Sequence, residues 1–235
     1  MSAKRTLDVL LAGMALLVVS PVLAIVAIGI RLGGGPGPIL FRAQRVGIHR
    51  RPFTMFKFRT MRIGNAPTAS VITAQGDPRI FPLGRLMRSA KLDELPQLFN
   101  ILRGEMSIVG PRPEDPGMVT RFYGPFHYKS LAVLPGLTSP GSIYAYTHGE
   151  AQLDLQDPER SYGERLLPIK MALDIVYVRH VSIAYDVALI ARTVWMLGGA
   201  LLGRRSFPLP PELPDAERIL RQEGGAGSGV TRMTA

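Results

Sequence analysis

The segment Ser89–Glu114 reads SAKLDELPQLFNILRGEMSIVGPRPE and combines an acid pair, a helix start and an arginine-bearing turn. Asp93 and Glu94 precede apolar residues that recur at helical spacing. These apolar residues are Leu95, Leu98, Phe99, Ile101 and Leu102. Pro96 falls in the first turn, where a residue without a backbone N–H is tolerated. The pattern predicts a helix with the acid pair at its N-terminus and with Gly104 at its end.

This placement has chemical consequences for both carboxylates. A helix N-terminus carries unpaired N–H groups and the positive end of the dipole, which stabilise anions. Adjacent helical residues point in different directions, so one carboxylate can face a substrate while the other holds a cation. The following turn, Gly110–Pro113, presents Arg112, whose guanidinium suits bidentate phosphate binding. Taken alone, Asp93 is more often a helix cap than a catalyst, and Arg112 can be an ordinary loop residue.

Composition narrows the class of partner. The chain has 235 residues and a formal net charge of +10, with a sequence pI near 10.4. Nucleic acid, anionic lipid and phosphorylated substrates all suit that charge. The absence of cysteine excludes disulfides, thiolate metal sites and cysteine nucleophiles. The four histidines show no spacing typical of metal ligands.

The first third of the chain indicates a membrane segment. Residues Val9–Ile30 are uncharged and long enough to cross a hydrocarbon core of roughly 30 Å. Ser20 and Pro21 lie at the middle, where proline bends or breaks a helix. Both flanks are basic, and no Asp or Glu occurs between Val9 and Gly76. A helix that enters and returns to the cytoplasmic face leaves both flanks inside. A spanning helix and a cleaved signal peptide are the alternatives.

Several motifs together resemble one family. The run from Leu92 to Glu114 resembles the signature of the bacterial monotopic phosphoglycosyl transferases, the sugar transferases that begin lipid-linked glycan assembly. Lys57–Met61, KFRTM, and the Pro-Gly-Leu-Thr element ending at Thr138 resemble further motifs of that family. The match fails at Ser142–Gly149, SIYAYTHG, where many members carry an Asn-Gly-Arg element. Substrate identity is therefore the least constrained feature.

The resemblance implies an α/β fold, mostly helical with short strands, in a monotopic membrane protein. We expect residues 1–32 to form a re-entrant helix broken at Ser20-Pro21, and residues 33–206 to form a cytoplasmic catalytic domain with interfacial amphipathic helices. Residues 207–235 would be a proline-rich linker and flexible tail, and residues 65–76 a polar loop. Within Ser182–Leu202, Arg192 would reach toward lipid headgroups. A buried core helix is the alternative for that segment.

The resemblance also implies an activity. A nucleoside diphosphate sugar, most often a UDP-sugar, would give its phosphosugar to polyprenyl (undecaprenyl) phosphate at the cytoplasmic face of the inner membrane, in exopolysaccharide or lipopolysaccharide biosynthesis. Asp93 would be the nucleophile that forms an aspartyl intermediate, and Glu94 would bind Mg²⁺. The residues expected to bind substrate phosphates are Lys57, Arg59, Arg88, Arg112 and Pro113.

Two other classes of function use the same features. A membrane-tethered nucleic-acid-binding module would exploit the basic charge and the aromatic residues interleaved with Lys57 and Arg59. It would not explain the membrane segment, and the family resemblance implies no nucleic-acid partner. A non-catalytic scaffold for glycan assembly would keep the fold without turnover. The intact acid pair favours an enzyme over a scaffold.

Overall fold

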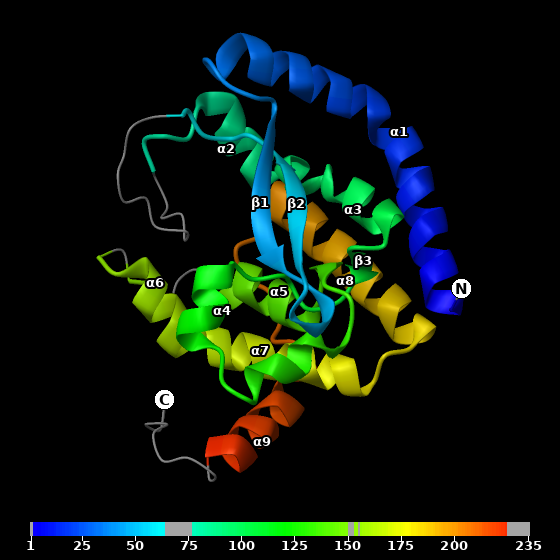
Figure 1. The fold of residues 1–235 in the computed structure, drawn as a ribbon, viewed down its shortest axis with the longest axis vertical. Coiled ribbons are helices and arrows are strands. Elements are labelled where there is room, and N and C mark those ends of the chain that lie inside the picture. The colour runs from blue at the N-terminus through cyan, green and yellow to red at the C-terminus, as the bar shows by residue number, and fades with distance from the viewer. Residues whose placement is uncertain (1, 64–76, 150–152, 155, 225–235) are drawn as a thin grey trace.

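A computed structural model describes residues 2–63, 77–149, 153–154 and 156–224 (Figure 1). The predicted loop at 65–76 and the tail beyond Gly224 lie outside the described residues. The helices of the described chain are α1 (Ala3–Gly33), α2 (Pro82–Ser89), α3 (Gln97–Arg103), α4 (Pro116–Phe122), α5 (Pro140–Tyr144), α6 (Pro158–Ser161), α7 (Leu167–Arg179), α8 (Ile183–Leu201) and α9 (Leu213–Gly224). Shorter turns are the 3₁₀ segments η1 (Ile48–Arg50), η2 (Leu92–Glu94) and η3 (His127–Ala132) and the π-helical segments η4 (Ala145–Gly149) and η6 (Tyr162–Leu166).

Among the described residues, the strands form two small sheets. β1 (Leu40–Val46) and β2 (Pro52–Phe58) pair antiparallel, with Phe41 opposite Lys57. β3 (Ser107–Val109) and β4 (Gly136–Thr138) pair in parallel. The prediction of a mostly helical chain with short strands is confirmed.

The β3–β4 pair fixes the turn that carries Arg112. Gly110 N–H donates to the Thr138 carbonyl at 2.9 Å, and Gly136 N–H donates to the Pro111 carbonyl at 3.0 Å. A Cβ added at Gly136 would lie 2.2 Å from the Gly110 nitrogen, so no side chain fits between these backbones. Glycine at both positions therefore lets the turn lie directly against β4.

Helix α1 continues through Pro21 instead of breaking there. The expected break at Ser20-Pro21 is corrected to a bend, which is visible halfway along the blue helix in Figure 1. Proline removes only one backbone hydrogen bond, and the Ser20 hydroxyl donates to the Leu17 carbonyl at 2.9 Å on the same turn. Large apolar side chains are exposed along the whole helix: Leu10, Met14, Leu17, Val18, Val22, Ile25, Ile28 and Leu32.

The first turns of α1 are bonded to the body of the protein. Arg5 donates to the carbonyls of Ile101 and Leu102 at the end of α3, at 2.6 and 3.0 Å. Asp8 is 4% exposed and accepts hydrogen bonds from the Ser107 hydroxyl at 2.8 Å and the Ile108 N–H at 3.0 Å. The beginning of the apolar helix is therefore fastened to α3 and β3.

The far end of α1 is held by apolar packing against the same body. Val26 and Ile30 are buried against Phe58 at the end of β2 and against Phe81 and Met87 beside and within α2. Both ends of the helix therefore contact one domain, although the side chains between them are largely exposed and apolar. Two described helices, α1 and α8, are long and apolar enough to cross a membrane by length and composition.

The charges in α8 are neutralised inside the protein. Lys4 Nζ lies 2.6 Å from Asp186 Oδ2, and the Tyr177 hydroxyl donates to Asp186 Oδ1 at 2.7 Å. Arg192 donates to both oxygens of Glu212, at 3.0 and 2.8 Å. The expectation that Arg192 reaches toward headgroups is therefore wrong, because a carboxylate from the next segment binds it. One side of α8 is buried and the other exposes Val187, Val194 and Trp195.

The C-terminal expectation is partly wrong. Residues 213–224 form α9 instead of a flexible tail. Ala216 and Ile219 are buried against Ala172, Leu173 and Val176 of α7. These two apolar residues are three positions apart, so one face of a short amphipathic helix can bury both. The proline-rich stretch before it supplies Glu212, the partner of Arg192.

We predict that Asp8→Ala destabilises the protein, because the buried Ser107 hydroxyl and the partly buried Ile108 N–H lose their acceptor. Such a loss costs about 1–3 kcal/mol, which for a chain of this size lowers Tm by roughly 2–4 °C per kcal/mol. Thermal unfolding of the detergent-purified protein measures this. Thr6→Ala is the matched control, since Thr6 is exposed on the same helix. Equal melting temperatures for the two variants would contradict the assigned role of Asp8.

Candidate active site

The acid pair lies where the sequence predicts, in the turn that leads into α3. Asp93 and Glu94 occupy the 3₁₀ segment η2, and α3 begins at Gln97. The turn is tighter than an α-helix because Pro96 has no N–H to donate to the Leu92 carbonyl, which instead accepts from the Leu95 N–H at 3.3 Å. Lys91, just before the turn, adopts a left-handed backbone with φ of 55°.

Glu94 holds two cations from separate parts of the chain. Arg112 binds it bidentately, Nη1 to Oε2 at 2.9 Å and Nη2 to Oε1 at 2.5 Å. Lys57 Nζ from β2 lies 3.4 Å from Oε1. Burial opposes ionisation of Glu94, yet the charges of Arg112 and Lys57 outweigh it and hold the pKa of Glu94 well below its usual value. Glu94 is therefore an anion that positions both cations.

Asp93 has a different environment from its neighbour. Its side chain is buried, and Oδ1 has no hydrogen-bond partner. Burial raises the pKa of the Asp93 carboxyl above 3.8, and the charge of Glu94 raises it further. The cations Lys57, Lys91 and Arg88 oppose that shift without cancelling it. A carboxylate with an oxygen free of hydrogen bonds is suited to attack an electrophile that enters beside it.

Arg88 and Lys91 complete the positive side of this site. Arg88, in the last turn of α2, donates through Nε to the Thr60 hydroxyl at 2.9 Å. Lys91 Nζ lies 4.8 Å from the centroid of the Tyr146 ring, a distance typical of a cation–π contact. Tyr146 belongs to η4, where the motif match fails in the sequence. The divergent segment therefore contacts a residue two positions from Asp93.

Arg59 has different partners. It donates to the backbone carbonyls of Gly34, Gly35, Pro38 and Met61, at 2.7, 3.0, 2.7 and 3.3 Å. These bonds fasten the linker after α1 to the chain that follows β2. These bonds give Arg59 a structural role. They do not support its expected role in substrate binding.

A second buried cluster supports the arginine turn. Pro113 is buried, and the next residue, Glu114, accepts hydrogen bonds from Lys170 Nζ and from the Tyr162 hydroxyl. Sequence reasoning missed this cluster because Tyr162 and Lys170 lie about fifty positions downstream of Glu114. The available signal was a lysine within an apolar helical segment, since a buried lysine usually has an anionic partner.

Gln97 was also missed. It is fully buried in the first turn of α3, four residues after Asp93, and both polar atoms of its amide lack a hydrogen-bond partner. Its position inside the acid-pair motif was the signal that could have identified it.

The side chains present could bind a magnesium ion only if a substrate supplied further ligands. No group of three or more His, Cys, Asp or Glu side chains that could hold a metal occurs among the described residues. Mg²⁺ commonly binds one or two carboxylates together with substrate phosphates and waters. Asp93 and Glu94 provide that number, although both Glu94 oxygens already face cations. The donor set therefore fits an ion completed by phosphate oxygens.

We predict that Asp93→Asn stabilises the fold at pH 7. A carboxyl whose pKa is raised on folding loses stability as the pH rises from its unfolded pKa through its folded pKa, and asparagine avoids this loss. The stability gain should shrink as the pH falls through the raised pKa toward 3.8, the ordinary value. Thermal unfolding between pH 7 and pH 4 measures it. A variant that is less stable than the wild type at pH 7 would contradict the assigned environment.

Comparisons with known proteins place the chain in a family. The model of the family described as bacterial sugar transferase matches residues 1–199. A UDP-N-acetylgalactosamine-undecaprenyl-phosphate N-acetylgalactosaminephosphotransferase from Aeromonas hydrophila is 34% identical over 81% of this chain and 42% of its own length. A UDP-glucose:undecaprenyl-phosphate glucose-1-phosphate transferase from Caulobacter vibrioides is 34% identical over 81% of this chain and 68% of its own. An exopolysaccharide production protein, PSS, from Rhizobium leguminosarum bv. phaseoli is 36% identical over 81% and 92%.

Several of these relatives are longer proteins, and the chain spans about two fifths of the Aeromonas protein. The matched region nevertheless includes the acid pair, the Arg112 turn and α1. The chain belongs to the bacterial sugar transferase family.

Proposed function

We propose that this protein is a phosphoglycosyl transferase that moves a phosphosugar from a nucleoside diphosphate sugar to polyprenyl phosphate. We propose a UDP-sugar as the donor. The relatives from Aeromonas and Caulobacter carry names that describe this class of reaction. The observation that carries the proposal is the acid pair, in which Glu94 is bound by Arg112 and Lys57 while the buried Asp93 keeps an oxygen without a partner.

The reaction would proceed in two displacements. The Asp93 carboxylate attacks the phosphorus bonded to the sugar, the bond to the bridging diphosphate oxygen breaks, and nucleoside monophosphate leaves with the electron pair. An oxygen of polyprenyl phosphate then attacks the same phosphorus, and the carboxylate of Asp93 is released. The products are nucleoside monophosphate and a polyprenyl diphosphate sugar. Such a covalent route gives ping-pong kinetics.

The surrounding cations fit this chemistry. Phosphoryl transfer depends mainly on positioning and on neutralising charge at the phosphate oxygens. Arg112 and Lys57 are held by Glu94, and Arg88 lies close enough to Asp93 to influence its pKa. Pro113 stiffens the turn that carries Arg112. When bound, Mg²⁺ would neutralise diphosphate charge, with Glu94 and the phosphate oxygens as its ligands.

We also propose a re-entrant arrangement of α1 at the cytoplasmic face of the bacterial inner membrane. Both ends of α1 contact the same domain, through Arg5 and Asp8 at one end and Ile30 at the other. A helix spanning the bilayer would separate these ends by roughly the thickness of the hydrocarbon core. The exposed apolar side chains between the ends would lie in lipid.

Cysteine labelling tests the topology, since the chain contains no cysteine of its own. Single cysteines at Ser2 and at Arg205 should both resist a membrane-impermeant maleimide added outside intact cells and react after permeabilisation. Labelling of the Ser2→Cys variant from outside, with Arg205→Cys protected, would mean that α1 spans the membrane.

Release of nucleoside monophosphate tests the reaction. We expect wild-type protein with undecaprenyl phosphate and Mg²⁺ to release nucleotide from at least one member of a panel of UDP- and GDP-sugars. Asp93→Asn should reduce the rate more than roughly a thousandfold, because it removes the nucleophile. Asp215→Asn, at an exposed pair on α9, is the matched control and should leave the rate unchanged.

Two results would contradict the proposal. Equal release by wild type and Asp93→Asn would remove Asp93 from the chemistry. A folded wild-type protein that releases nucleotide from no donor in the panel would argue against an enzyme of this class.

A further inference from the structure

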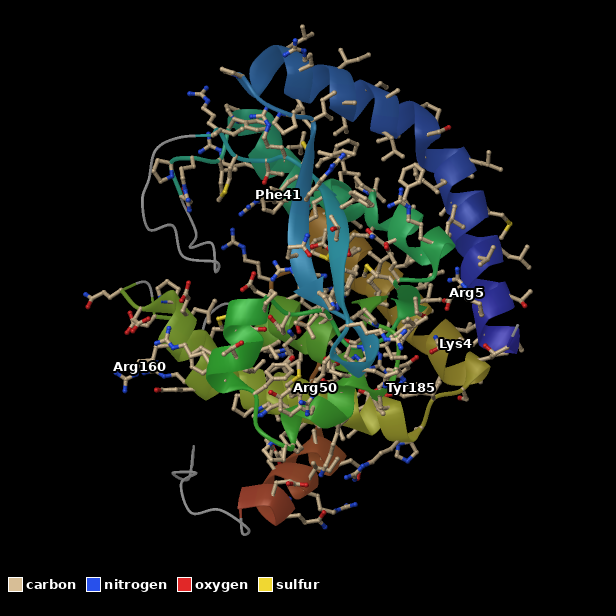
Figure 2. All side chains as sticks on the ribbon, in the orientation of Figure 1. Lys4, Arg5, Phe41, Arg50, Arg160 and Tyr185 are labelled. Carbon is tan, nitrogen blue, oxygen red and sulfur yellow. The ribbon has the colours of Figure 1, made fainter. Side chains whose placement is uncertain are left out.

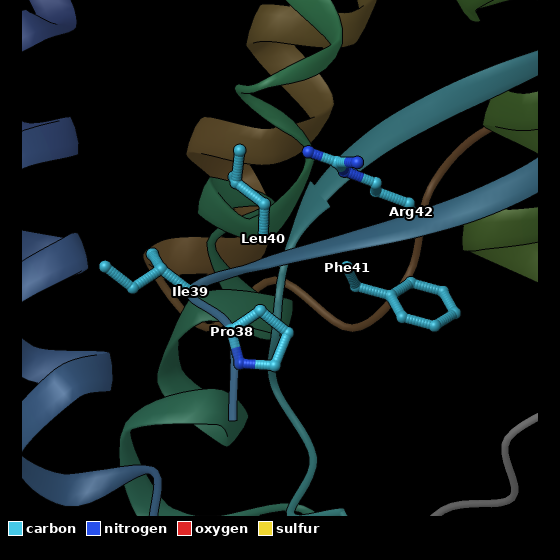
Figure 3. Close-up of a pocket in the computed structure, with 5 residues that line it drawn as sticks. All are labelled: Pro38, Ile39, Leu40, Phe41 and Arg42. Atoms are coloured by element: carbon cyan, nitrogen blue, oxygen red, sulfur yellow. The ribbon is translucent and has the colours of Figure 1, made fainter. Parts of the chain in front are cut away.

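A cavity of about 550 Å³ lies along the entry to β1, lined by Pro38, Ile39, Leu40, Phe41 and Arg42 (Figure 3). Four of these side chains are apolar, and the fifth carries a positive charge. Figure 3 shows the Phe41 ring and the Leu40 side chain extending in different directions from the strand. Phe41 is 54% exposed, so its ring is available to a ligand. Neither the acid pair nor the phosphate-binding side chains line this cavity.

One end of the cavity lies close to the reacting groups. Phe41 is opposite Lys57 in the β1–β2 register, and opposed residues in an antiparallel pair share one face with Cβ atoms about 4.5–5.5 Å apart. Lys57 in turn lies 3.4 Å from Glu94. A molecule that covers the Phe41 ring can therefore place a charged end beside Lys57.

The other end of the cavity leads toward the membrane helix. α1 ends at Gly33, and Arg59 fastens the linker of Gly34, Gly35 and Pro38 beside it. Leu32, in the last turn of α1, is 82% exposed, and Ile63, whose side chain packs over Gly37, is 68% exposed. Exposed apolar side chains therefore accompany the chain from the end of α1 to Phe41.

We propose that this cavity binds the isoprenoid units nearest the phosphate of the polyprenyl phosphate acceptor. The inference rests on the proposed function. The ligand must be apolar along most of its length and anionic at one end, which matches the apolar lining from Pro38 to Phe41 and the ammonium of Lys57 opposite Phe41. Arg42, the next residue along β1, lies on the other face of the strand. Pockets of about 300–1,000 Å³ enclose molecules of drug size, so this cavity can hold only the first part of a long chain. The remainder would stay in the bilayer beside α1.

The nucleobase of the donor is the competing occupant, because an exposed aromatic ring beside a cation can also stack a base. A base has polar edges that need hydrogen-bond partners when they are buried. The lining offers the side chain of Arg42 alone for that purpose. An isoprenoid needs no such partners, so the composition of the cavity favours the lipid.

Kinetics of the two half-reactions test the assignment. In nanodiscs with varied undecaprenyl phosphate, Phe41→Ser should raise the apparent KM for the acceptor roughly tenfold, because it removes a large apolar contact. Its rate of phosphosugar adduct formation with donor alone should be unchanged. Phe41→Leu should restore the acceptor KM to within about threefold of wild type, since an isoprenoid needs an apolar surface and not an aromatic ring. Phe99→Ser, at a similarly exposed phenylalanine on α3, is the matched control.

The opposite kinetic pattern would overturn the proposal. Slower adduct formation in Phe41→Ser, restored by Phe41→Trp and not by Phe41→Leu, would assign the cavity to the nucleobase. No change in either half-reaction would mean that the cavity binds neither substrate.

A binding measurement separates this inference from the proposed function. Benzophenone-bearing farnesyl phosphate, photolysed with the Asp93→Asn protein, should crosslink within residues 38–42, and excess undecaprenyl phosphate should compete. This result requires no turnover, so it stands even if no donor is consumed. Crosslinking elsewhere, with residues 38–42 unlabelled, would overturn the proposal while leaving the transferase activity to its own test.

Discussion

The carboxylate of Glu94 is the interaction on which the site depends. It joins three segments that are distant in sequence: the 3₁₀ turn that carries Asp93, strand β2 through Lys57, and the turn after β3 through Arg112. Each partner is largely removed from water. Loss of one partner from a buried pair commonly costs about 3–5 kcal/mol, because the remaining charge is left without compensation. The same contacts that hold the three segments together thus place two cations beside the acid pair, where we propose that substrate phosphates bind.

Contacts elsewhere in the fold hold these three segments in position. Gly110 and Gly136 allow the Arg112 turn to lie against β4, and Asp8 of α1 accepts hydrogen bonds from Ser107 and Ile108 of β3. Figure 1 shows the first half of α1 beside β3. Lys4 adds a bond from the same helix to α8, and Arg5 adds one to α3. Figure 2 shows Lys4 and Arg5 beside each other at the start of α1. Helix α1 is therefore bonded to the strand that leads into Arg112, so the packing of α1 and the position of the Arg112 turn are linked.

Local sequence signals were sufficient to predict the part of the site that lies within one short segment. The acid pair, the helix after it and the Arg112 turn lie within one short segment, and propensity and periodicity act at that range. Lys170 within an apolar helical segment indicated a buried anionic partner, but the sequence did not identify Glu114 as that partner, because long-range contacts leave no periodic pattern. Arg59 looked like Lys57 in sequence, yet the linker carbonyls bind it. α9 was missed because a short helix after a proline-rich stretch is stabilised mainly by its packing on α7.

The mass of the intact protein after incubation with donor alone tests the central claim most directly. With no acceptor present, the account predicts an added mass of one phosphosugar, located at Asp93 by fragmentation of the peptide that contains the acid pair, with Glu94 unmodified. Addition of polyprenyl phosphate should then remove it. Transfer of sugar phosphate to the lipid without any adduct, or an adduct on Glu94 instead, would contradict the roles assigned to the two carboxylates.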